Sequence, residues 1–310
     1  MRHSILRRAL LLLAALYIIG TIFGGIGLGW VALHPGRHPL TVQDQHKAEA
    51  TAQAEKAEFS NVEITASDGV ILRAWFIRPA YANGSAVILL HGVSDNRLGV
   101  YGYGWIVKNH YSVLLPDARA HGLSDGELAT YGLKESDDIH EWVTWLKESG
   151  HAQCVFGLGE SMGAAQLLES LSKEPRFCAV VAESPFASFR EVAYARFGQP
   201  FHTGPWLGRT FFRPTVEIAF LYVRLRYGLD MEAASPEQAV VATTVPVLLI
   251  HGLRDRNIPP YHSDRIQARS GSKIGLWNPR EAGHTGAHQA QAQEFEHKVL
   301  GWFSIHSSNN

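Results

Sequence analysis

Residues 154–171 read CVFGLGESMGAAQLLESL. The apolar run Cys154–Leu158 predicts a buried strand, and the run Met162–Leu171 predicts a helix. The joining residues, Gly159-Glu160-Ser161-Met162-Gly163, fit the pattern Gly-x-Ser-x-Gly. In a strand–turn–helix element of this kind the serine stands on a sharp turn, and glycine is needed on both sides because a larger side chain would clash. The stretch therefore predicts that Ser161 is a nucleophile raised above one edge of a sheet.

The chain holds a second match to this pattern, Gly122-Leu123-Ser124-Asp125-Gly126. Asp125 and Glu127 make its surroundings polar, and no helix-forming run begins directly after it. We therefore expect Ser124 to be a loop residue.

A serine hydroxyl becomes a useful nucleophile only when a base accepts its proton. Where a serine stands on such a turn, the acid and then the histidine follow it in the chain. Asp255 comes just after the apolar run Val247–Ile250, and His284 follows the run Lys273–Trp277. We predict that His284 is the base and that Asp255 orients it, with all three side chains on loops at the carboxyl ends of strands.

Backbone N–H groups are expected to stabilise the oxyanion that such a reaction develops. Met162, directly after the serine, supplies one donor, and the loop after the run Ala86–Leu90 supplies the other. That loop begins His91-Gly92-Val93, and we expect the N–H of Val93 to be the second donor. We interpret His91 as a structural residue, because the base comes last in this chain order.

Two alternatives concern the acid and a metal. Glu183 follows the run Cys178–Ala182 and rivals Asp255 as the acid, and no feature of the sequence excludes it. His284 and His288 are four residues apart, a spacing that metal ligands also show, but the chain has neither a His-Glu-x-x-His nor a Cys-x-x-Cys motif. We therefore expect no metal site.

From Phe59 onward the chain alternates predicted strands and helices. The first two strands flank Ser67-Asp68-Gly69, a turn signal, and short continuous apolar runs typical of strands buried on both faces follow. This order predicts an α/β fold: a mostly parallel, eight-stranded sheet with helices on both faces. The expected strands are Asn61–Ala66, Val70–Ile77, Ala86–Leu90, Ser112–Leu115, Cys154–Leu158, Cys178–Ala182, Val247–Ile250 and Lys273–Trp277, and the expected helices are Leu133–Lys147, Met162–Leu171 and Gln289–Phe303.

A segment at about 186–244 interrupts this alternation. It is rich in Phe, Arg, Trp and Tyr, and Val216–Tyr227 predicts an amphipathic helix. We interpret the segment as a helical cap inserted over the carboxyl edge of the sheet, since long insertions are usually functional. An ordinary crossover with one long helix is the alternative. Its Arg196, Arg209 and Arg213 are of the type that binds a substrate carboxylate or phosphate, but we expect them to be solvated.

The N-terminal segment, Ala9–Leu33, contains no charged residue. As a helix its 25 positions span about 37 Å, against about 30 Å for the hydrocarbon core of a bilayer. Arg2, Arg7 and Arg8 precede it, so the N-terminus is expected in the cytoplasm. We predict that residues 1–33 are a single-pass membrane anchor, with the catalytic domain on the periplasmic or extracytoplasmic side.

A cleaved signal peptide is the alternative to an anchor, because Gly27 and Gly29 are small residues at the spacing of a cleavage site. The polar segment 34–58 is expected to be a stalk, partly helical by propensity. Residues 59–303 then form the catalytic domain. The chain has 28 basic and 29 acidic residues, a net charge of −1 that gives no electrostatic case for nucleic acid as a partner.

These residues together resemble the α/β-hydrolase superfamily over most of Phe59–Phe303. The resemblance is carried by His91-Gly92 after a strand, by the stretch PDARAHGLS at 116–124, and by the turn at Ser161. Within it the chain looks like the membrane-anchored Bem46/ABHD-type serine hydrolases at Ser184-Pro185-Phe186, at SPEQAV (235–240) and at HGLRD (251–255). The long aromatic, arginine-rich insert departs from that pattern.

The resemblance implies an esterase, lipase or thioesterase that uses no metal or organic cofactor, and it implies that Asp117 and His121 are structural. We expect Ser161 to attack an ester, thioester or lipid acyl group of a small-molecule or lipid substrate and to form an acyl-enzyme intermediate. The alternatives are a peptidase or acyltransferase with the same three residues, or a non-catalytic binding scaffold on the same fold.

In the usual strand order of this fold the fifth and sixth strands are neighbours. Cys154 and Cys178 open those two strands. In an oxidising compartment they would be able to form a disulfide, whereas buried free thiols are the alternative.

Overall fold

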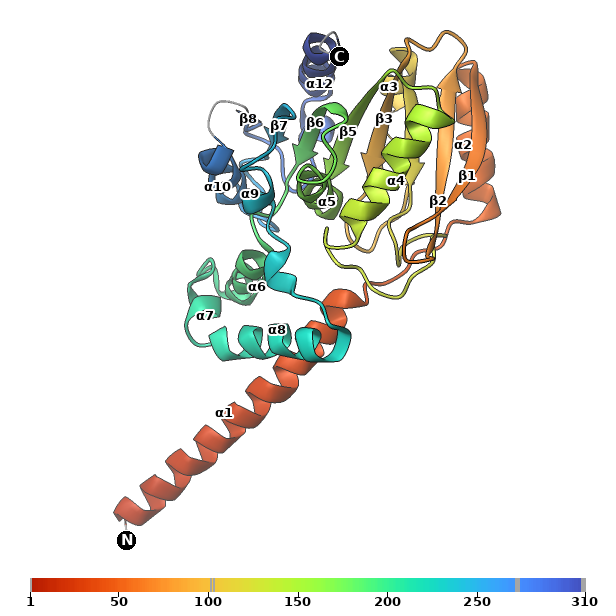
Figure 1. Cartoon of the computed structure of the whole chain (residues 1–310). Coiled ribbons are helices and arrows are strands. Elements are labelled where there is room, and N and C mark those ends of the chain that lie inside the picture. Colours follow the sequence, from red (N-terminus) through yellow and green to blue (C-terminus); the bar gives the residue numbers. More distant parts are fainter. Residues whose placement is uncertain (1, 101, 103, 271–273, 308–310) are drawn as a thin grey trace. The chain divides into compact units, whose positions relative to one another are not determined.

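The computed structural model describes residues 2–100, 102, 104–270 and 274–307 (Figure 1). The chain forms two compact units. The insert unit consists of Met1–His34 and Phe189–Ala233, and the sheet unit consists of Pro35–Ser188 and Ala234–Asn310. Each unit is described on its own below.

The sheet unit contains one eight-stranded sheet with the strand order β1-β2-β4-β3-β5-β6-β7-β8. The β1–β2 and β2–β4 pairs are antiparallel and all other pairs are parallel, which confirms the predicted mostly parallel sheet. Lys273, the expected first residue of the last strand, lies outside the described residues. The strands are β1 Ala57–Thr65, β2 Ile71–Pro79, β3 Ser85–Leu90, β4 Ser112–Pro116, β5 Cys154–Glu160, β6 Phe177–Glu183, β7 Val247–Ile250 and β8 Ile274–Trp277.

Helices cover both faces of this sheet. Neighbouring residues of each strand point to opposite faces, so each face of the sheet packs against its own set of helices. In β3, Val87 and Leu89 belong to the apolar core that also includes residues of α2, α3 and α12. Ile88 and Leu90 belong to the core shared with α4, α5 and α10. The helices of this unit are α2 Val42–Ala54, α3 Gly104–Lys108, α4 Glu135–Glu148, α5 Met162–Ser170, α9 Pro236–Ala239, α10 Tyr261–Ser270, α11 Ala287–Ala290 and α12 Ala292–His306.

The segment 34–58, expected to be a polar stalk, contains α2, which packs against the sheet. Thr41 and Asp44 form a capping box at its start, so its orphan N–H groups have partners. Ala48 and Ala52, four residues apart, are buried in the core. Two small side chains on one helical face are a weak hydrophobic signal, and for this reason the composition suggested a solvated segment.

The C-terminal helix also differs from the expectation. The predicted single helix Gln289–Phe303 is divided at Gln291, whose extended backbone (φ −145°, ψ 56°) separates α11 from α12. Phe295, Val299 and Phe303 of α12 are buried against the sheet.

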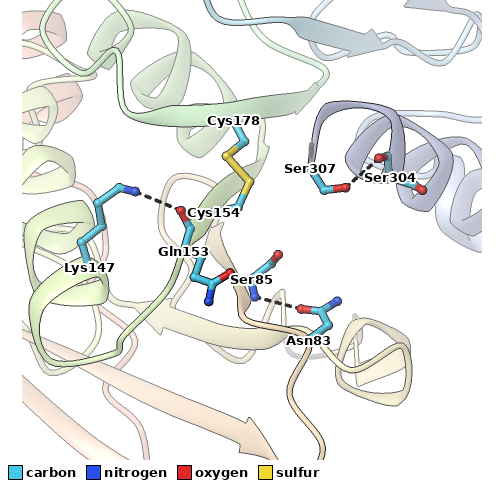
Figure 2. The surroundings of a disulfide bond; sticks show 8 residues. All are labelled: Asn83, Ser85, Lys147, Gln153, Cys154, Cys178, Ser304 and Ser307. Carbon is cyan, nitrogen blue, oxygen red and sulfur yellow. Dashed lines mark hydrogen bonds between the residues drawn. A yellow bond between two sulfur atoms is a disulfide. The ribbon is translucent and has the colours of Figure 1, made fainter. Parts of the chain in front are cut away.

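A disulfide joins Cys154 at the start of β5 to Cys178 in β6 (Figure 2). The two strands are parallel neighbours, and the Cα atoms of the two cysteines are 5.9 Å apart. Of the two alternatives for these residues, the structure therefore has the linked pair.

The insert unit contains α1 (Arg2–Leu33), which is long and apolar enough over His3–Leu33 to cross a membrane. The inserted segment 189–233 is shorter than the expected 186–244, because Ala234 and the residues after it belong to the sheet unit. The expected helix Val216–Tyr227 begins three residues earlier, at Arg213. The inserted elements are α6 Phe189–Gly198, η2 Gln199–Phe201, α7 Trp206–Arg209, α8 Arg213–Tyr227 and η3 Met231–Ala233.

Candidate active site

Ser161 stands on the sharp turn between β5 and α5. Its backbone has φ 51° and ψ −110°, a conformation that L-residues rarely adopt and that is typical of strained functional turns. A Cβ atom on Gly159 would lie 2.6 Å from the carbonyl carbon of Gly163, and one on Gly163 would collide with the carbonyl oxygen of Leu90. Both glycines are therefore required by close backbone approach.

The structure brings the side chains of Ser161, His284 and Asp255 together. Nε2 of His284 lies 2.8 Å from Oγ of Ser161, and Nδ1 of His284 lies 2.7 Å from Oδ2 of Asp255. An ionised carboxylate accepts hydrogen bonds only, so Nδ1 carries the proton and Nε2 is left as an acceptor for the serine O–H. The three residues come from the loops after β5, β7 and β8, as the sequence predicts.

Asp255 is buried and has several partners. Its Oδ1 accepts the backbone N–H groups of Asn257 (2.8 Å) and Ile258 (2.9 Å), and Nε2 of His251 lies 3.4 Å from its Oδ2. Burial by itself would raise the pKa of Asp255, but hydrogen bonds from His251 and His284 outweigh it and hold that pKa below its usual range. A charged carboxylate therefore faces the imidazole of His284.

His251 is a residue of this site that the sequence analysis did not single out. It directly follows β7 and is fully buried, with Nδ1 2.6 Å from Oγ of Ser263 and Nε2 2.8 Å from the carbonyl oxygen of Ile258. These contacts fix the loop that carries Asp255. The available signal was its position, at the end of a strand and four residues before the acid.

Glu183, the rival acid, lies at the end of β6 and is buried. Its Oε1 accepts the backbone N–H of Ala287 at 2.8 Å. Ser184, the next residue, accepts the N–H of Thr285 at 3.3 Å. Glu183 thus contacts the backbone of the loop that holds His284, whereas the imidazole is bonded to Asp255.

The loop His91–Val93 runs beside the serine. A Cβ atom on Gly92 would lie 3.7 Å from Cβ of Ser161, which is ordinary van der Waals contact. Met162 is the first residue of α5, so its N–H is at the positive end of the helix dipole. The two N–H groups named as oxyanion donors, those of Val93 and Met162, therefore lie on the segments that flank Ser161.

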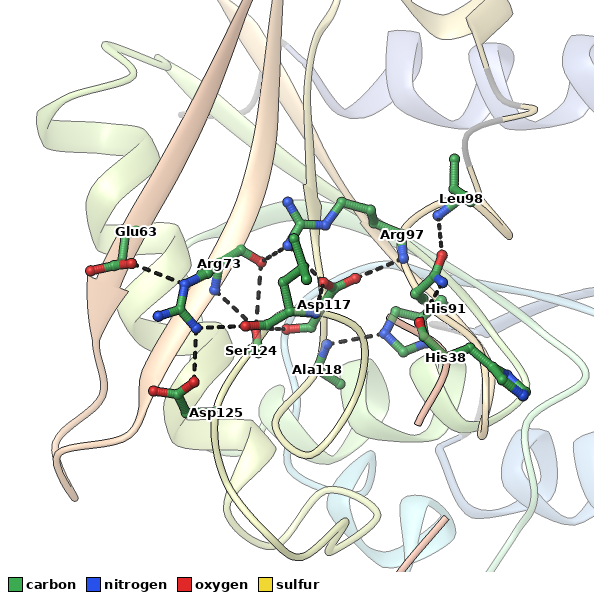
Figure 3. A network of polar contacts seen from close by, with 12 residues as sticks. His38, Glu63, Arg73, His91, Arg97, Leu98, Asp117, Ala118, Ser124 and Asp125 are labelled. Carbon is green, nitrogen blue, oxygen red and sulfur yellow. Dashed lines mark hydrogen bonds and ion pairs between the residues drawn. The ribbon is translucent and has the colours of Figure 1, made fainter. Parts of the chain in front are cut away.

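His91 and His121 hold this loop in place. Nε2 of His91 accepts the N–H of Ala118 at 3.0 Å (Figure 3), and Nε2 of His121 accepts the N–H of Ser94 at 3.2 Å. Burial lowers the pKa of His91, and it lowers the pKa of His121 to about 4. Both imidazoles are therefore neutral acceptors near pH 7, which agrees with structural roles.

Asp117 links the loops that follow β3 and β4 (Figure 3). Its carboxylate accepts the Arg97 guanidinium at 2.7 Å and the backbone N–H groups of Arg97 (2.9 Å) and Leu123 (2.7 Å). Ser124 is fully buried in the same network, where its Oγ donates to the carbonyl oxygen of Asp117 at 2.8 Å and accepts the N–H of Arg73 at 2.9 Å. Ser124 is thus a loop residue with bonds to the backbone.

The arginines singled out in the insert have partners within the insert unit. Arg209 pairs with Glu191 at 2.6 Å, Arg213 lies 3.8 Å from Glu217, and Arg196 donates to Gln199 at 3.3 Å. Within the described part of the chain, no group of three or more His, Cys, Asp or Glu side chains is arranged to hold a metal ion.

Comparisons with known proteins agree with this fold. The family model described as the alpha/beta hydrolase family matches residues 87–297. The uncharacterized protein YqkD of Bacillus subtilis (strain 168) is 27% identical over 242 residues, covering 76% of this chain and 75% of that protein. The esterase Pf2001 of Pyrococcus furiosus has a similar structure, with a TM-score of 0.68 and 25% identity over 88% of this chain and 99% of that one.

A second similar structure is an acylaminoacyl peptidase of Pyrococcus horikoshii, with a TM-score of 0.62. It is 16% identical, and the match covers 81% of this chain but 42% of the peptidase. At this identity the likeness extends to the fold alone.

Proposed function

This chain belongs to the alpha/beta hydrolase family, and we propose that it is a serine hydrolase of the carboxylesterase or lipase type that forms an acyl-enzyme on Ser161. The observation that carries the proposal is the continuous chain of hydrogen bonds from Ser161 through His284 to Asp255, at 2.8 and 2.7 Å. This is the geometry that an activated serine needs.

In the first half of the proposed reaction, Oγ of Ser161 attacks the acyl carbon while Nε2 of His284 takes its proton. The charge of Asp255 stabilises the imidazolium that forms, and the N–H groups of Val93 and Met162 donate to the oxyanion. When the tetrahedral intermediate collapses, His284 gives the proton to the leaving alcohol or thiol, and the acyl group stays on Ser161.

In the second half, water attacks the acyl-enzyme and His284 takes a proton from that water. Collapse of the second intermediate returns the proton to Oγ and releases a carboxylic acid. The substrate class is an ester, thioester or lipid acyl group. The likeness to the Pyrococcus furiosus esterase supports ester chemistry.

Labelling with a fluorophosphonate probe tests this proposal. The folded wild-type chain is expected to be labelled on Ser161, and Ser161→Ala is expected to lose the label and the hydrolysis of p-nitrophenyl esters. Ser149→Ala, which removes an exposed hydroxyl at the end of α4, is the control and should keep both. A folded wild-type chain that takes no label would overturn the proposal in favour of a binding scaffold.

We also propose that α1 remains attached as a membrane anchor. Residues Gly25 and Gly29 of α1 pack against α8 in the insert unit, so a Cβ atom at Gly29 would lie 3.0 Å from the carbonyl oxygen of Ala219. Cleavage at Gly27 or Gly29 would remove most of the surface on which α8 packs. The packing therefore supports an anchor over a cleaved signal peptide.

A further inference from the structure

The inserted segment exposes large apolar side chains. Phe211 and Leu221 are 55% and 53% exposed, and Leu225 is 78% exposed. Phe201 and Trp206 are also more than half exposed. Single exposed apolar residues are ordinary, but several on one small segment are typical of a surface that meets an apolar partner.

Within the insert unit, α8 lies along α1 and runs in the same direction. Just before the start of α8, the carbonyl oxygen of Phe211 accepts a hydrogen bond from Oη of Tyr17 at 2.6 Å. In the middle, a Cβ atom on Gly25 would lie 2.6 Å from Cγ2 of Ile218. At the C-terminal end of both helices, called the outer end below, the rings of His34 and Tyr227 are 5.9 Å apart. Close approach of two backbones over glycine is common between helices in membranes.

The contact between α1 and α8 lies within the part of α1 that is long enough to cross a bilayer. A hydrocarbon core of about 30 Å takes about 20 helical residues, which, counted from the residue after Arg8, are Ala9–Leu28. Tyr17 is nine residues after Arg8, a rise of only about 14 Å. If α1 spans the bilayer, the parts of the insert that contact Tyr17 and Gly25 lie at hydrocarbon depth.

Charged groups of the insert near this level are paired, as charges at membrane depth usually are. Glu217 on α8 accepts a hydrogen bond from Arg190 at 2.5 Å and another from the hydroxyl of Tyr194 at 2.8 Å. Arg213, at the start of α8, lies 3.8 Å from the same carboxylate.

The outer end of the helix pair has the composition of a membrane–water interface. Trp30 stacks on His34, and Tyr227 follows in the same cluster. Arg224 and Arg226 lie in the last turn of α8 and are exposed, where lipid phosphates would be able to reach them. Aromatic rings and basic residues concentrate at this level in membrane proteins.

We propose that the inserted segment is itself a lipid-contacting element, with the α7–α8 turn and the first turns of α8 immersed in the hydrocarbon core beside α1. The inference rests on the proposed membrane anchor and does not depend on the hydrolase chemistry. The partner is a bilayer, with acyl chains against Phe211 and Leu221 and headgroup phosphates near Arg224 and Arg226.

Spin labels at single cysteines test the proposal in the full chain, reconstituted in vesicles of phosphatidylethanolamine and phosphatidylglycerol. The two native cysteines are joined, so under non-reducing conditions only an introduced thiol reacts. Labels on Phe211→Cys, Leu221→Cys and Leu225→Cys are compared for accessibility to oxygen, which enters lipid, and to a water-soluble nickel complex. Leu12→Cys in α1 is the lipid control, and Tyr81→Cys, 83% exposed in the sheet unit, is the water control.

The oxygen-to-nickel ratio is expected to be several-fold higher at 211 and 221 than at 81, and depth should decrease in the order 211, 221, 225. A nickel accessibility at 211 equal to that at 81, with 12 in lipid, would overturn the proposal. Exclusion of both reagents at 211 and 221 would overturn it as well, since protein would then cover the surface. A label at residue 12 that is exposed to water would also overturn the proposal, because α1 would then not span the bilayer.

Hydrolysis of a soluble p-nitrophenyl ester by the same preparations reports on the proposed chemistry independently. If the spin labels have the expected depths but the ester is not hydrolysed, only the proposed function is overturned. If the ester is hydrolysed but the labels at 211 and 221 are not in lipid, only this inference is overturned.

Discussion

Asp255 illustrates how one side chain is specified by its surroundings. Two backbone N–H groups occupy Oδ1, and the imidazole of His284 occupies Oδ2, with His251 at 3.4 Å. These donors all favour the charged carboxylate, and they fix its direction as well as its charge. Removing the charge should therefore affect both the reaction and the pH dependence of stability.

Asp255→Asn is expected to lower kcat for p-nitrophenyl ester hydrolysis by about 10³–10⁴-fold with little change in KM. An amide NH₂ presented to Nδ1 would favour the tautomer with the proton on Nε2, so the imidazole would no longer accept the serine proton. Steady-state kinetics measure this change. An activity within tenfold of wild type would mean that another acid, Glu183 in the first place, orients His284.

The same substitution should alter stability in a defined pH window. The folded-state pKa of Asp255 is depressed, so its stabilising contribution is present above the unfolded value of about 3.9 and is lost as pH falls below it. We expect the free energy of unfolding of wild type to exceed that of Asp255→Asn by about 1–2 kcal/mol at pH 6–7 and the difference to shrink below pH 4. Urea unfolding at several pH values measures it, with the exposed Asp264→Asn as a control.

The three residues brought together at the site could be predicted from sequence because each follows a recognisable strand in a fixed chain order. The choice between Asp255 and Glu183 could not be made from that order, since both lie at or just after the end of a buried strand, between Ser161 and His284 in the chain. It depends on which loop turns its carboxylate toward His284. The contribution of His251 was hidden for the same reason: its contacts with Ile258 and Ser263 arise only when the loop closes on itself.

At the scale of elements, the turn at Ser161 depends on backbone contacts that tolerate no side chain. Gly159→Ala would place a methyl group 2.6 Å from the backbone of Gly163. We expect it to cost about 1–3 kcal/mol of stability and, by displacing the serine, to lower kcat/KM by about 10²-fold.

Gly301→Ala is the matched control for that substitution. It lies inside α12, and among the described residues no atom is within 4 Å of its added Cβ. Alanine should stabilise that helix by up to about 1 kcal/mol and leave activity unchanged. Thermal unfolding and ester hydrolysis distinguish the two variants, and equal effects would contradict the argument from close approach.

The disulfide between β5 and β6 closes a loop with a sequence separation of 24. Restriction of the unfolded chain by a loop of this size is worth about 3 kcal/mol. The double variant Cys154→Ala, Cys178→Ala should lose about that free energy in urea unfolding, and reduced wild type should match it. A loss below about 1 kcal/mol would mean that the link contributes little beyond strand pairing.

Some helices and strands could be predicted from the sequence more easily than others. All eight strands were predicted, the first two because they flank the turn signal Ser67-Asp68-Gly69 and the other six because each is a short apolar run. The docking of α2 was not, because Ala48 and Ala52 provide its contact face and alanine carries little hydrophobic signal. The break at Gln291 was also missed, since a single change of backbone conformation leaves the helical periodicity on either side intact.

For the whole molecule, the charges before α1 predict its orientation. A full-length chain with alkaline phosphatase fused after residue 310 should be enzymatically active in Escherichia coli, because the fusion lies on the periplasmic side. Neutralising Arg2, Arg7 and Arg8 together should reduce that activity. Membrane extraction and intact mass should show an uncleaved, membrane-retained chain, and a soluble product that begins near residue 30 would contradict the anchor.

The contact between α1 and α8 also has a consequence for the timing of biogenesis. Gly25 and Ile218 touch in the finished protein but are 193 positions apart in the chain (218 minus 25). At about 5–20 residues per second, a ribosome needs on the order of 10–40 s to make the second helix after the first has emerged. Throughout that interval the glycine face of the nascent α1 has no intramolecular partner, so the contact with α8 forms only late in synthesis.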